Sequence, residues 1–188
     1  MLRPLNGFNS GTKVNQIISD LLINFLEKSN KISKKHDSKL NNFEVKLLNM
    51  GRTNSIKNTI KNKFRHLEFY NKNKSFAHII NNYKMSIHFF LGTPFIESLY
   101  YNKPCILILK REIHMNFDQQ FNSILNKLKK ANICFEDVNK AAKFFNANEK
   151  SLYEWWESNK VQKIRKLYCD KYCRNFKSKK DLLKKIFI

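Results

Sequence analysis

The sequence predicts an α/β fold built on a single open, Rossmann-like parallel sheet, followed by an α-helical C-terminal tail. Three observations support this. Glycine and proline occur only 4 and 3 times in 188 residues, whereas an all-β sandwich needs more of both for its turns. Dense apolar runs at residues 85–91 and 104–109 are typical of buried parallel strands. Helical patterns alternate with these and weaker strand patterns, as in an open α/β sheet.

The first 42 residues predict a leading helix and a polar linker. Residues 14–29 carry apolar side chains along one helical stripe, and Thr12 is a suitable N-cap. Residues 30–42 are polar and rich in lysine. We therefore place the start of the main domain at residue 43.

Residues 43–150 are predicted to form the Rossmann-like nucleotide-binding domain. Its strands are expected at residues 43–50, 66–69, 85–91, 104–109 and 133–135. Its helices are expected at residues 53–63, 75–82, 93–102, 117–131 and 137–145, with Ser75, Thr93 and Asp137 as N-caps. Because residues 85–109 hold a strand, a helix and a strand within about 25 residues, they predict a tight βαβ unit with neighbouring parallel strands.

Residues 151–188 are predicted to form helices that pack back on this domain. They are expected at residues 152–157, 160–174 and 179–187. Adjacent residues on a helix point about 100° apart, so at most one of Trp155 and Trp156 can face a given ligand. We expect at least one of the two indoles to be buried and to join the tail to the sheet.

The charge of the chain permits two interpretations. A net charge of +21, from 36 basic and 15 acidic residues, suits a binder of nucleic acid or anionic surfaces. However, 30 of the basic residues are lysine and 6 are arginine, and asparagine occurs 25 times, a composition that A/T-rich codons also produce. Specific nucleic-acid recognition favours arginine, and the charge is spread along the chain. We expect no specific nucleic-acid partner, and a non-catalytic basic module for RNA or anionic surfaces stays the alternative.

Cysteine usage and apolar runs bear on cofactors and localisation. Cys105, Cys134, Cys169 and Cys173 include no C-x-x-C pair, so neither a zinc ribbon nor another metal or cofactor site is expected. Residues 1–13 lack the apolar region of a secretory signal, and apolar stretches stay far below the ~20 residues of a membrane span. We expect a soluble cytoplasmic protein with free thiols.

The candidate ligand site lies where the strand at residues 85–91 meets the next helix. Ligands of open parallel sheets bind beyond the carboxyl ends of the strands, and a helix N-terminus there suits a phosphate. Gly92 permits close backbone approach, Thr93 adds a hydroxyl, and Glu97, one turn later, can accept both hydrogen bonds of a ribose diol. In the alternative interpretation Thr93 only caps the helix and Glu97 is exposed to water.

Basic residues and histidines near the two strands also permit a functional and a structural interpretation. Lys110, Arg111 and His114 follow the second strand, face the same rim and can supply positive charge to a diphosphate. The alternative is a solvated charged loop. His88 lies inside the first strand and is interpreted as a core residue rather than a catalyst.

The segment LGTPFIESLYYNKPCILIL resembles the donor-nucleotide half of GT-B glycosyltransferases, with its small-residue turn, E-S-L, N-K-P and second strand. Together with FNSILNKLKKANICFED, VNKAAKFFN and SLYEWWESNKVQKIRKLYCDKYCR, residues 43–174 resemble the C-terminal part of bacterial surface-polysaccharide transferases, which are similar to capsule and spore-coat polysaccharide transferases. The more specific part is the Trp155–Trp156 pair followed by Val161–Gln162 and Tyr168–Cys169.

The resemblance implies a nucleotide-sugar donor, with Glu97 on its ribose and Gly92, Thr93 and Pro94 at its diphosphate. It also implies a polysaccharide or lipid-linked acceptor and a weak peripheral association with the inner membrane. The turn departs from the small hydroxyl residues of the relatives, since Pro94 removes one N–H donor. GT-B enzymes have two Rossmann-like domains and this chain has room for one. We therefore expect a partial enzyme, with no catalytic residue assigned and its activity alone left open.

Overall fold

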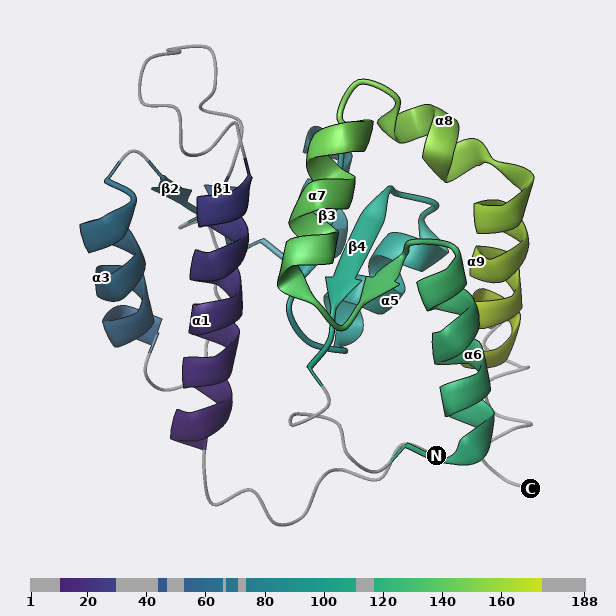
Figure 1. Ribbon diagram of the computed structural model, residues 1–188, viewed down its shortest axis with the longest axis horizontal. Helices are drawn as coiled ribbons and strands as arrows, with labels where there is room; N and C mark the ends of the chain where they lie inside the picture. Colours follow the sequence, from purple (N-terminus) through teal and green to yellow (C-terminus); the bar gives the residue numbers. More distant parts are fainter. Residues whose placement is uncertain are drawn as a thin grey trace.

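Three parallel strands organise the larger part of the structure, a computed structural model of the chain (Figure 1). The structure describes residues 11–29, 44–46, 53–65, 67–70, 74–110 and 117–173. The strands lie in the order β3-β4-β5, and they are β3 (Ser86–His88), β4 (Cys105–Ile108) and β5 (Cys134–Phe135).

Helix α5 (Thr93–Tyr100) joins β3 to β4, and helix α6 (Gln119–Lys130) joins β4 to β5. Ser86 pairs with Cys105 and His88 with Leu107, in parallel register. The prediction of two neighbouring parallel strands with a crossover helix between them is therefore confirmed. The first strand is shorter than the apolar run at residues 85–91, because the chain bends after His88.

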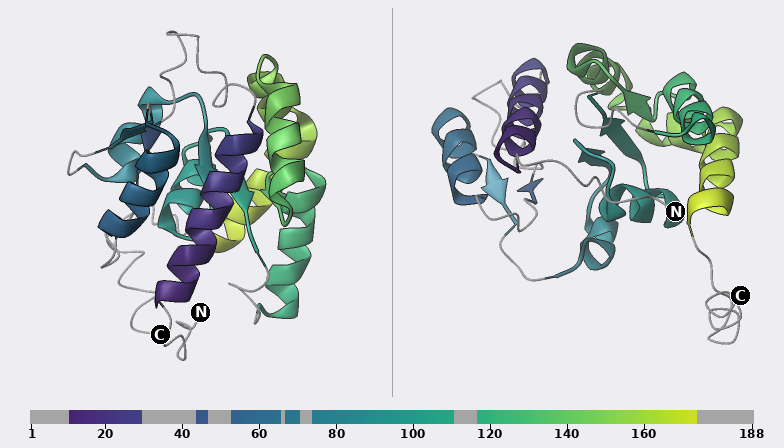
Figure 2. Two further views of the ribbon diagram at one scale, coloured as in Figure 1. Left: turned by 60° about the vertical axis from the view of Figure 1, so that its left-hand side comes forward. Right: turned by 90° about the horizontal axis from the view of Figure 1, so that it is seen from below.

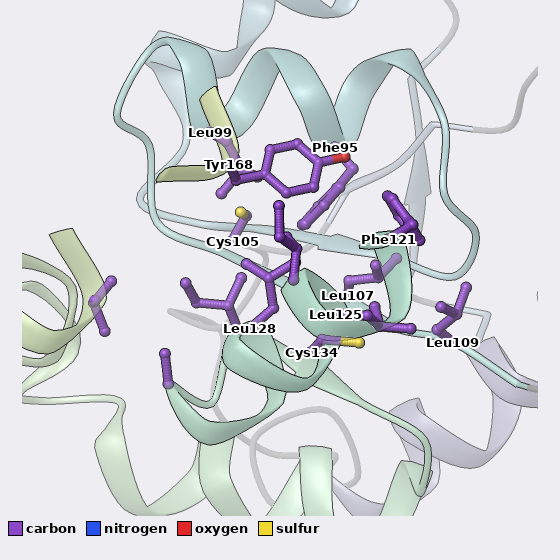
Figure 3. Packing of buried hydrophobic residues seen from close by; sticks show 14 of the residues in the cluster. Phe95, Leu99, Cys105, Leu107, Leu109, Phe121, Leu125, Leu128, Cys134 and Tyr168 are labelled. Carbon is purple, nitrogen blue, oxygen red and sulfur yellow. The ribbon is translucent and has the colours of Figure 1, made fainter. Parts of the chain in front are cut away.

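Strand β4 is buried on both of its faces. Cys105, Leu107 and Leu109 point into a core shared with α5 and α6 (Figure 3). Ile106 and Ile108 point into a second core on the opposite face of the sheet. Helices α1 (Gly11–Lys28) and α7 (Val138–Asn148) close this face through Leu21, Phe25, Ala141, Ala142 and Phe145. Helices thus cover both faces of the sheet (Figure 2), which explains the continuous apolar runs.

A second, two-stranded parallel sheet lies next to α1 and helix α3 (Thr53–Lys63) (Figure 1). It pairs β1 (Glu44–Val45) with β2 (Glu68–Phe69), and α3 lies between them in the chain. The expectation of one single sheet is thus not confirmed for the described strands. The physical reason is a separate apolar core: Leu67 and Phe69 pack with Ile60 and Phe64 against α1.

Helix starts were predicted with mixed success. Asp137 is the N-cap of α7, accepting bonds from the N–H groups of Asn139 and Lys140 at 2.7 and 3.3 Å. Thr93 was wrong as the N-cap of α5, because Gly92 takes that position with an extended backbone. Thr12 was also wrong, since α1 begins at Gly11.

The short helix α4 (Phe76–Ile79) continues into the 3₁₀ turn η1 (Ile80–Asn82). Ser75 is its N-cap by position, but the Ser75 hydroxyl pairs with Nδ1 of His78 at 2.6 Å instead of with a backbone N–H. This segment leads into β3 and places Phe76 near His88.

The tail consists of α8 (Leu152–Glu157) and α9 (Asn159–Tyr172), which pack against α5 and α6. Trp156 is 0% exposed. Its indole and that of Trp155 donate hydrogen bonds to Asn102 and Ala131, in the sheet domain. The predicted role of the tryptophans is therefore confirmed, whereas the helix expected at residues 179–187 lies outside the described residues.

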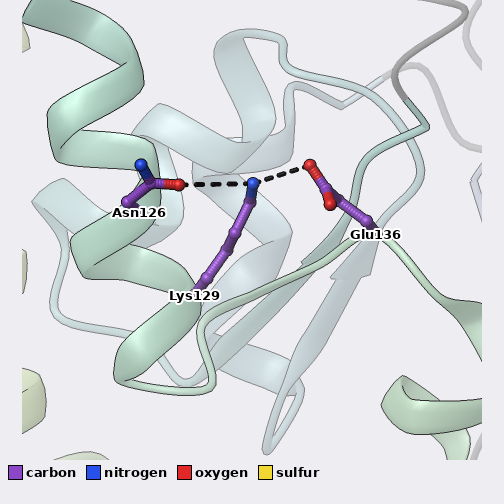
Figure 4. A network of polar contacts seen from close by, with 3 residues as sticks. All are labelled: Asn126, Lys129 and Glu136. Atoms are coloured by element: carbon purple, nitrogen blue, oxygen red, sulfur yellow. Dashed lines mark hydrogen bonds and ion pairs between the residues drawn. The ribbon is translucent and has the colours of Figure 1, made fainter.

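An exposed polar contact ties the end of α6 to the segment after β5 (Figure 4). Lys129 Nζ lies 2.6 Å from Glu136 Oε1 and 3.5 Å from Asn126 Oδ1. Exposed pairs of this kind contribute about 0–1 kcal/mol, so the buried cores carry most of the stability. None of the helices in the described part of the chain is long and apolar enough to span a membrane.

Candidate ligand site on helix α5

The N-terminus of α5 follows the carboxyl end of β3, at the edge where open parallel sheets bind ligands. The carbonyl oxygen of Gly92 accepts bonds from the N–H groups of Phe95 and Ile96 at 3.1 and 3.3 Å. Pro94 has no N–H to donate. Of the first-turn donors, those of Gly92 and Thr93 make none of the hydrogen bonds found among the described residues. A ligand phosphate would therefore meet two backbone donors here.

Gly92 leaves space for a neighbouring aromatic ring and is not required by its backbone angles. Its φ of −143° is an extended conformation open to any residue. A Cβ added at this position would collide with the ring of Phe90. In this structure the Phe90 ring, from the preceding turn, therefore fills the space beside Gly92 that was predicted for a ligand.

Glu97 lies one turn further along α5 and is half-buried. It lines a groove of about 370 Å³ whose other walls are Ile96, Tyr100, Tyr101, Tyr172 and Cys173. Burial raises the pKa of the Glu97 carboxyl. The exposed Thr93 and the half-buried Gly92 are not part of the groove lining, so the groove runs along the C-terminal half of the helix rather than over its first turn.

The cations predicted near the diphosphate follow strand β4. Lys110 is half-buried and lies two residues beyond the strand. Because β3 and β4 are parallel neighbours, Lys110 and Gly92 both follow carboxyl ends at the same edge of the sheet. Arg111 and His114 lie outside the described residues, so the structure does not place them.

His88 belongs to a satisfied polar cluster behind α5. Its Nε2 lies 2.9 Å from Ser86 Oγ and 3.0 Å from Ser98 Oγ, and the Ser98 hydroxyl donates to the carbonyl of Pro94 at 2.9 Å. The imidazole packs edge-on to the rings of Phe76 and Phe95. Desolvation lowers the pKa of His88 to about 3. His88 is half-buried, and its contacts with the two serines and the two rings are those of a packed structural residue.

The C-terminal end of α5 is held by the tail. Asn102 adopts a positive φ of 54° and ends the turn after the helix. Trp156 Nε1 donates to the Asn102 backbone and side-chain oxygens at 3.2 and 3.0 Å. Gln162 Nε2 donates to the same side-chain oxygen at 3.1 Å and to the Trp156 carbonyl at 2.9 Å.

Arg165 also holds the C-terminal end of α5, and this role was not predicted from the sequence. Its Nη1 donates to the Leu99 carbonyl at 2.9 Å, and its Nε donates to Gln162 Oε1 at 2.9 Å. No local pattern in the sequence marks this contact, because Leu99 lies 66 residues earlier in the chain. Together, Trp156, Gln162 and Arg165 of the tail fix the position of α5 rather than contact a ligand at its N-terminus.

The chemistry available at the N-terminus of α5 suits binding. Two N–H donors favour an anion, and a carboxylate one turn later favours a hydroxyl-bearing group. Among the described residues no group of three or more His, Cys, Asp or Glu side chains is arranged to hold a metal ion. The structure assigns no catalytic side chain to this site.

A protein-family model described as "LIC12162 family transferase" matches residues 19–187. The match covers the second half of α1, both sheets and helices α8 and α9. No curated protein and no solved structure shows significant similarity to the chain.

Proposed function

The chain belongs to the LIC12162 family of transferases, and on that premise we propose that it is a glycosyltransferase-like protein of bacterial surface-polysaccharide biosynthesis that binds a nucleotide-activated sugar donor. The proposed donor site consists of Gly92, Thr93, Pro94 and Glu97. The acceptor would be a polysaccharide or a lipid-linked precursor.

One observation carries this proposal. The backbone donors of Gly92 and Thr93 follow the carboxyl end of a parallel strand, and the half-buried Glu97 lies one helical turn later on α5. The donors and the helix dipole would hold the diphosphate. The carboxylate would accept two hydrogen bonds from the ribose diol, which are about twice as strong as neutral ones.

Other groups at the same edge would supply charge. Lys110 follows the neighbouring strand β4 and would face the diphosphate side of the ligand. Arg111 and His114 stay predictions from the sequence for the same role. Pro94 would fix the backbone of the first turn without donating.

The fold is compatible with the donor half of a GT-B enzyme. The run β3-α5-β4-α6-β5 forms a parallel sheet with helices on both faces. In this interpretation the acceptor would be presented to the edge beyond Gly92 by a second domain or subunit, which would also provide the catalytic base.

Calorimetric titration of a panel of nucleoside diphosphates tests the site. We expect wild-type protein to bind at least one of them, and Glu97→Gln to weaken that binding by about 1–3 kcal/mol, the range for a hydrogen bond to a charged group. Glu157→Gln is the matched control, because Glu157 is exposed on α8 and away from the groove. This control should bind as the wild type does.

The other outcomes are equally specific. Equal affinities of the wild type and Glu97→Gln, or no binding by the wild type up to millimolar ligand, would contradict the donor site. The alternative of a basic binding module would be favoured by RNA binding that weakens steeply with salt. On a duplex, the logarithm of the association constant falls against the logarithm of the salt concentration with a slope of about −0.9 per phosphate neutralised.

A further inference from the structure

Two thiols lie one turn apart at the C-terminal end of α9. Cys169 and Cys173 are both free and partly exposed, whereas Cys105 and Cys134 are buried. The N–H of Cys173 donates to the carbonyl of Cys169 at 2.9 Å, so a closed helical turn holds the two residues together. Side chains four apart on a helix face the same side, with Cβ atoms about 5–6 Å apart.

Cys169 has the surroundings of a reactive thiol. A hydrogen bond from the Cys173 thiol and the positive charge of Arg165 lower the pKa of Cys169, against the opposing effect of its partial burial. The Arg165 guanidinium is itself fixed by its bonds to Leu99 and Gln162. The hydrogen bond with Cys169, together with burial, raises the pKa of the Cys173 thiol. The neighbouring Arg165 and the closed turn favour Cys169 as the more reactive thiol of the pair.

We propose that Cys169 and Cys173 form an oxidation site for small hydroperoxides, with Cys169 as the attacking thiolate and Cys173 as the resolving thiol. The Cys169 sulfur attacks one peroxide oxygen and the O–O bond breaks. The other oxygen leaves as hydroxide or alkoxide, which takes a proton from water or solvent to become water or an alcohol. Cys169 is oxidised to the sulfenic acid. The Cys173 sulfur then attacks the Cys169 sulfur, the S–O bond breaks, and water leaves with the Cys173 proton.

Closing this disulfide changes the end of α9. A disulfide needs Cβ atoms about 3.5–4.5 Å apart, so the last turn must distort. Cys173 is already the C-cap, with a non-helical ψ of 103°, which makes the distortion possible there. Tyr172 packs on Phe121 and, with Cys173, lines the groove beside Glu97. Oxidation therefore moves one wall of that groove.

The test treats the reduced, full-length chain with equimolar hydrogen peroxide, then alkylates it and maps the cysteines by mass spectrometry. We expect a disulfide between Cys169 and Cys173, reversed by dithiothreitol, while the buried Cys105 and Cys134 stay alkylatable after unfolding. In Cys173→Ser, a cyclic 1,3-diketone should trap a sulfenic acid on Cys169. Cys169→Ser should lose that trapping, with circular dichroism confirming that both variants fold.

Three results would overturn the proposal. They are two free thiols after oxidation of the folded protein, a disulfide that joins Cys169 to Cys105 instead, and trapping on Cys173 rather than on Cys169. The expected rate difference is also measurable: at pH 7 iodoacetamide should alkylate Cys169 at least about tenfold faster than Cys173, since the thiolate is the reactive form.

Discussion

The two ends of helix α5 differ in how they are held. At the C-terminal end, the side chains of Trp156, Gln162 and Arg165 bind the turn at Asn102 and the carbonyl of Leu99. At the N-terminal end, Gly92 has no side chain to cap the helix, and two backbone donors make no hydrogen bond among the described residues. Side-chain hydrogen bonds from the tail thus hold the C-terminal end, whereas the N-terminal end is held by the packing of Phe95 in the core.

Trp156→Ala tests the anchored end with the largest expected effect. Trp156 is fully buried and its indole donates to Asn102, so truncation should lower the free energy of unfolding by about 3–5 kcal/mol. Urea denaturation followed by circular dichroism measures this. Trp156→Phe is the matched control: it retains most of the volume and should cost clearly less. A loss below 1 kcal/mol in Trp156→Ala would show that the tail does not anchor the helix.

Asn102→Ala should lower stability by about 1–3 kcal/mol, because it removes the side-chain acceptor shared by Trp156 and Gln162 and because alanine tolerates a positive φ less well than asparagine. Asn102→Gly removes the same acceptor but tolerates the backbone conformation, so it should retain about 1 kcal/mol more. Thermal or urea unfolding of both variants separates the two causes. Equal losses would mean that the backbone angle contributes nothing.

His88, which lies on β3 and packs against Phe95 of α5, should give a pH effect of similar or smaller size. The pKa of His88 is lowered to about 3 in the folded protein, so below pH 6.5 the unfolded chain binds more protons than the folded one. The free energy of unfolding should therefore decrease as the pH is lowered, by about 1–2 kcal/mol from pH 6.5 to pH 5 from this group. His88→Gln should flatten that slope. An unchanged slope in the variant would assign the acid sensitivity to other groups.

Thr93→Ala is expected to have the smallest effect on stability, within about 0.5 kcal/mol, since Thr93 is exposed and does not cap the helix. Nucleoside diphosphate binding should nevertheless weaken, because the hydroxyl is proposed to contact the ligand, and Thr93→Ser should restore it. If Thr93→Ala lowered stability by more than 1 kcal/mol, the N-terminal end would be anchored too.

Features that depend on local sequence patterns could be predicted from the sequence. The parallel pairing of β3 with β4 followed from two dense apolar runs flanking one amphipathic helix, since local pattern and burial agree there. The polar helix α3 was likewise predicted at residues 53–63, with the bounds it has in the structure.

Features that depend on long-range packing were not predicted. Arg165 meets Leu99, 66 residues earlier in the chain, and no local pattern marks that contact. The second sheet forms because Leu67 and Phe69 find a separate core against α1, a choice made by tertiary packing. Gly92 and not Thr93 is the N-cap of α5, and the ring of Phe90 occupies the space beside Gly92.

Hydrogen–deuterium exchange across α5, with and without a saturating nucleoside diphosphate, tests the difference between its two ends most directly. We expect the amides of residues 98–102 to be protected in both states, because the tail holds that end. The amides of residues 92, 93 and 95–97 should exchange faster without ligand and gain protection when it binds, since Pro94 has no N–H. Protection gained only at residues 98–102, or no change at either end with any nucleotide, would contradict the assignment of the ligand site to the N-terminus of α5.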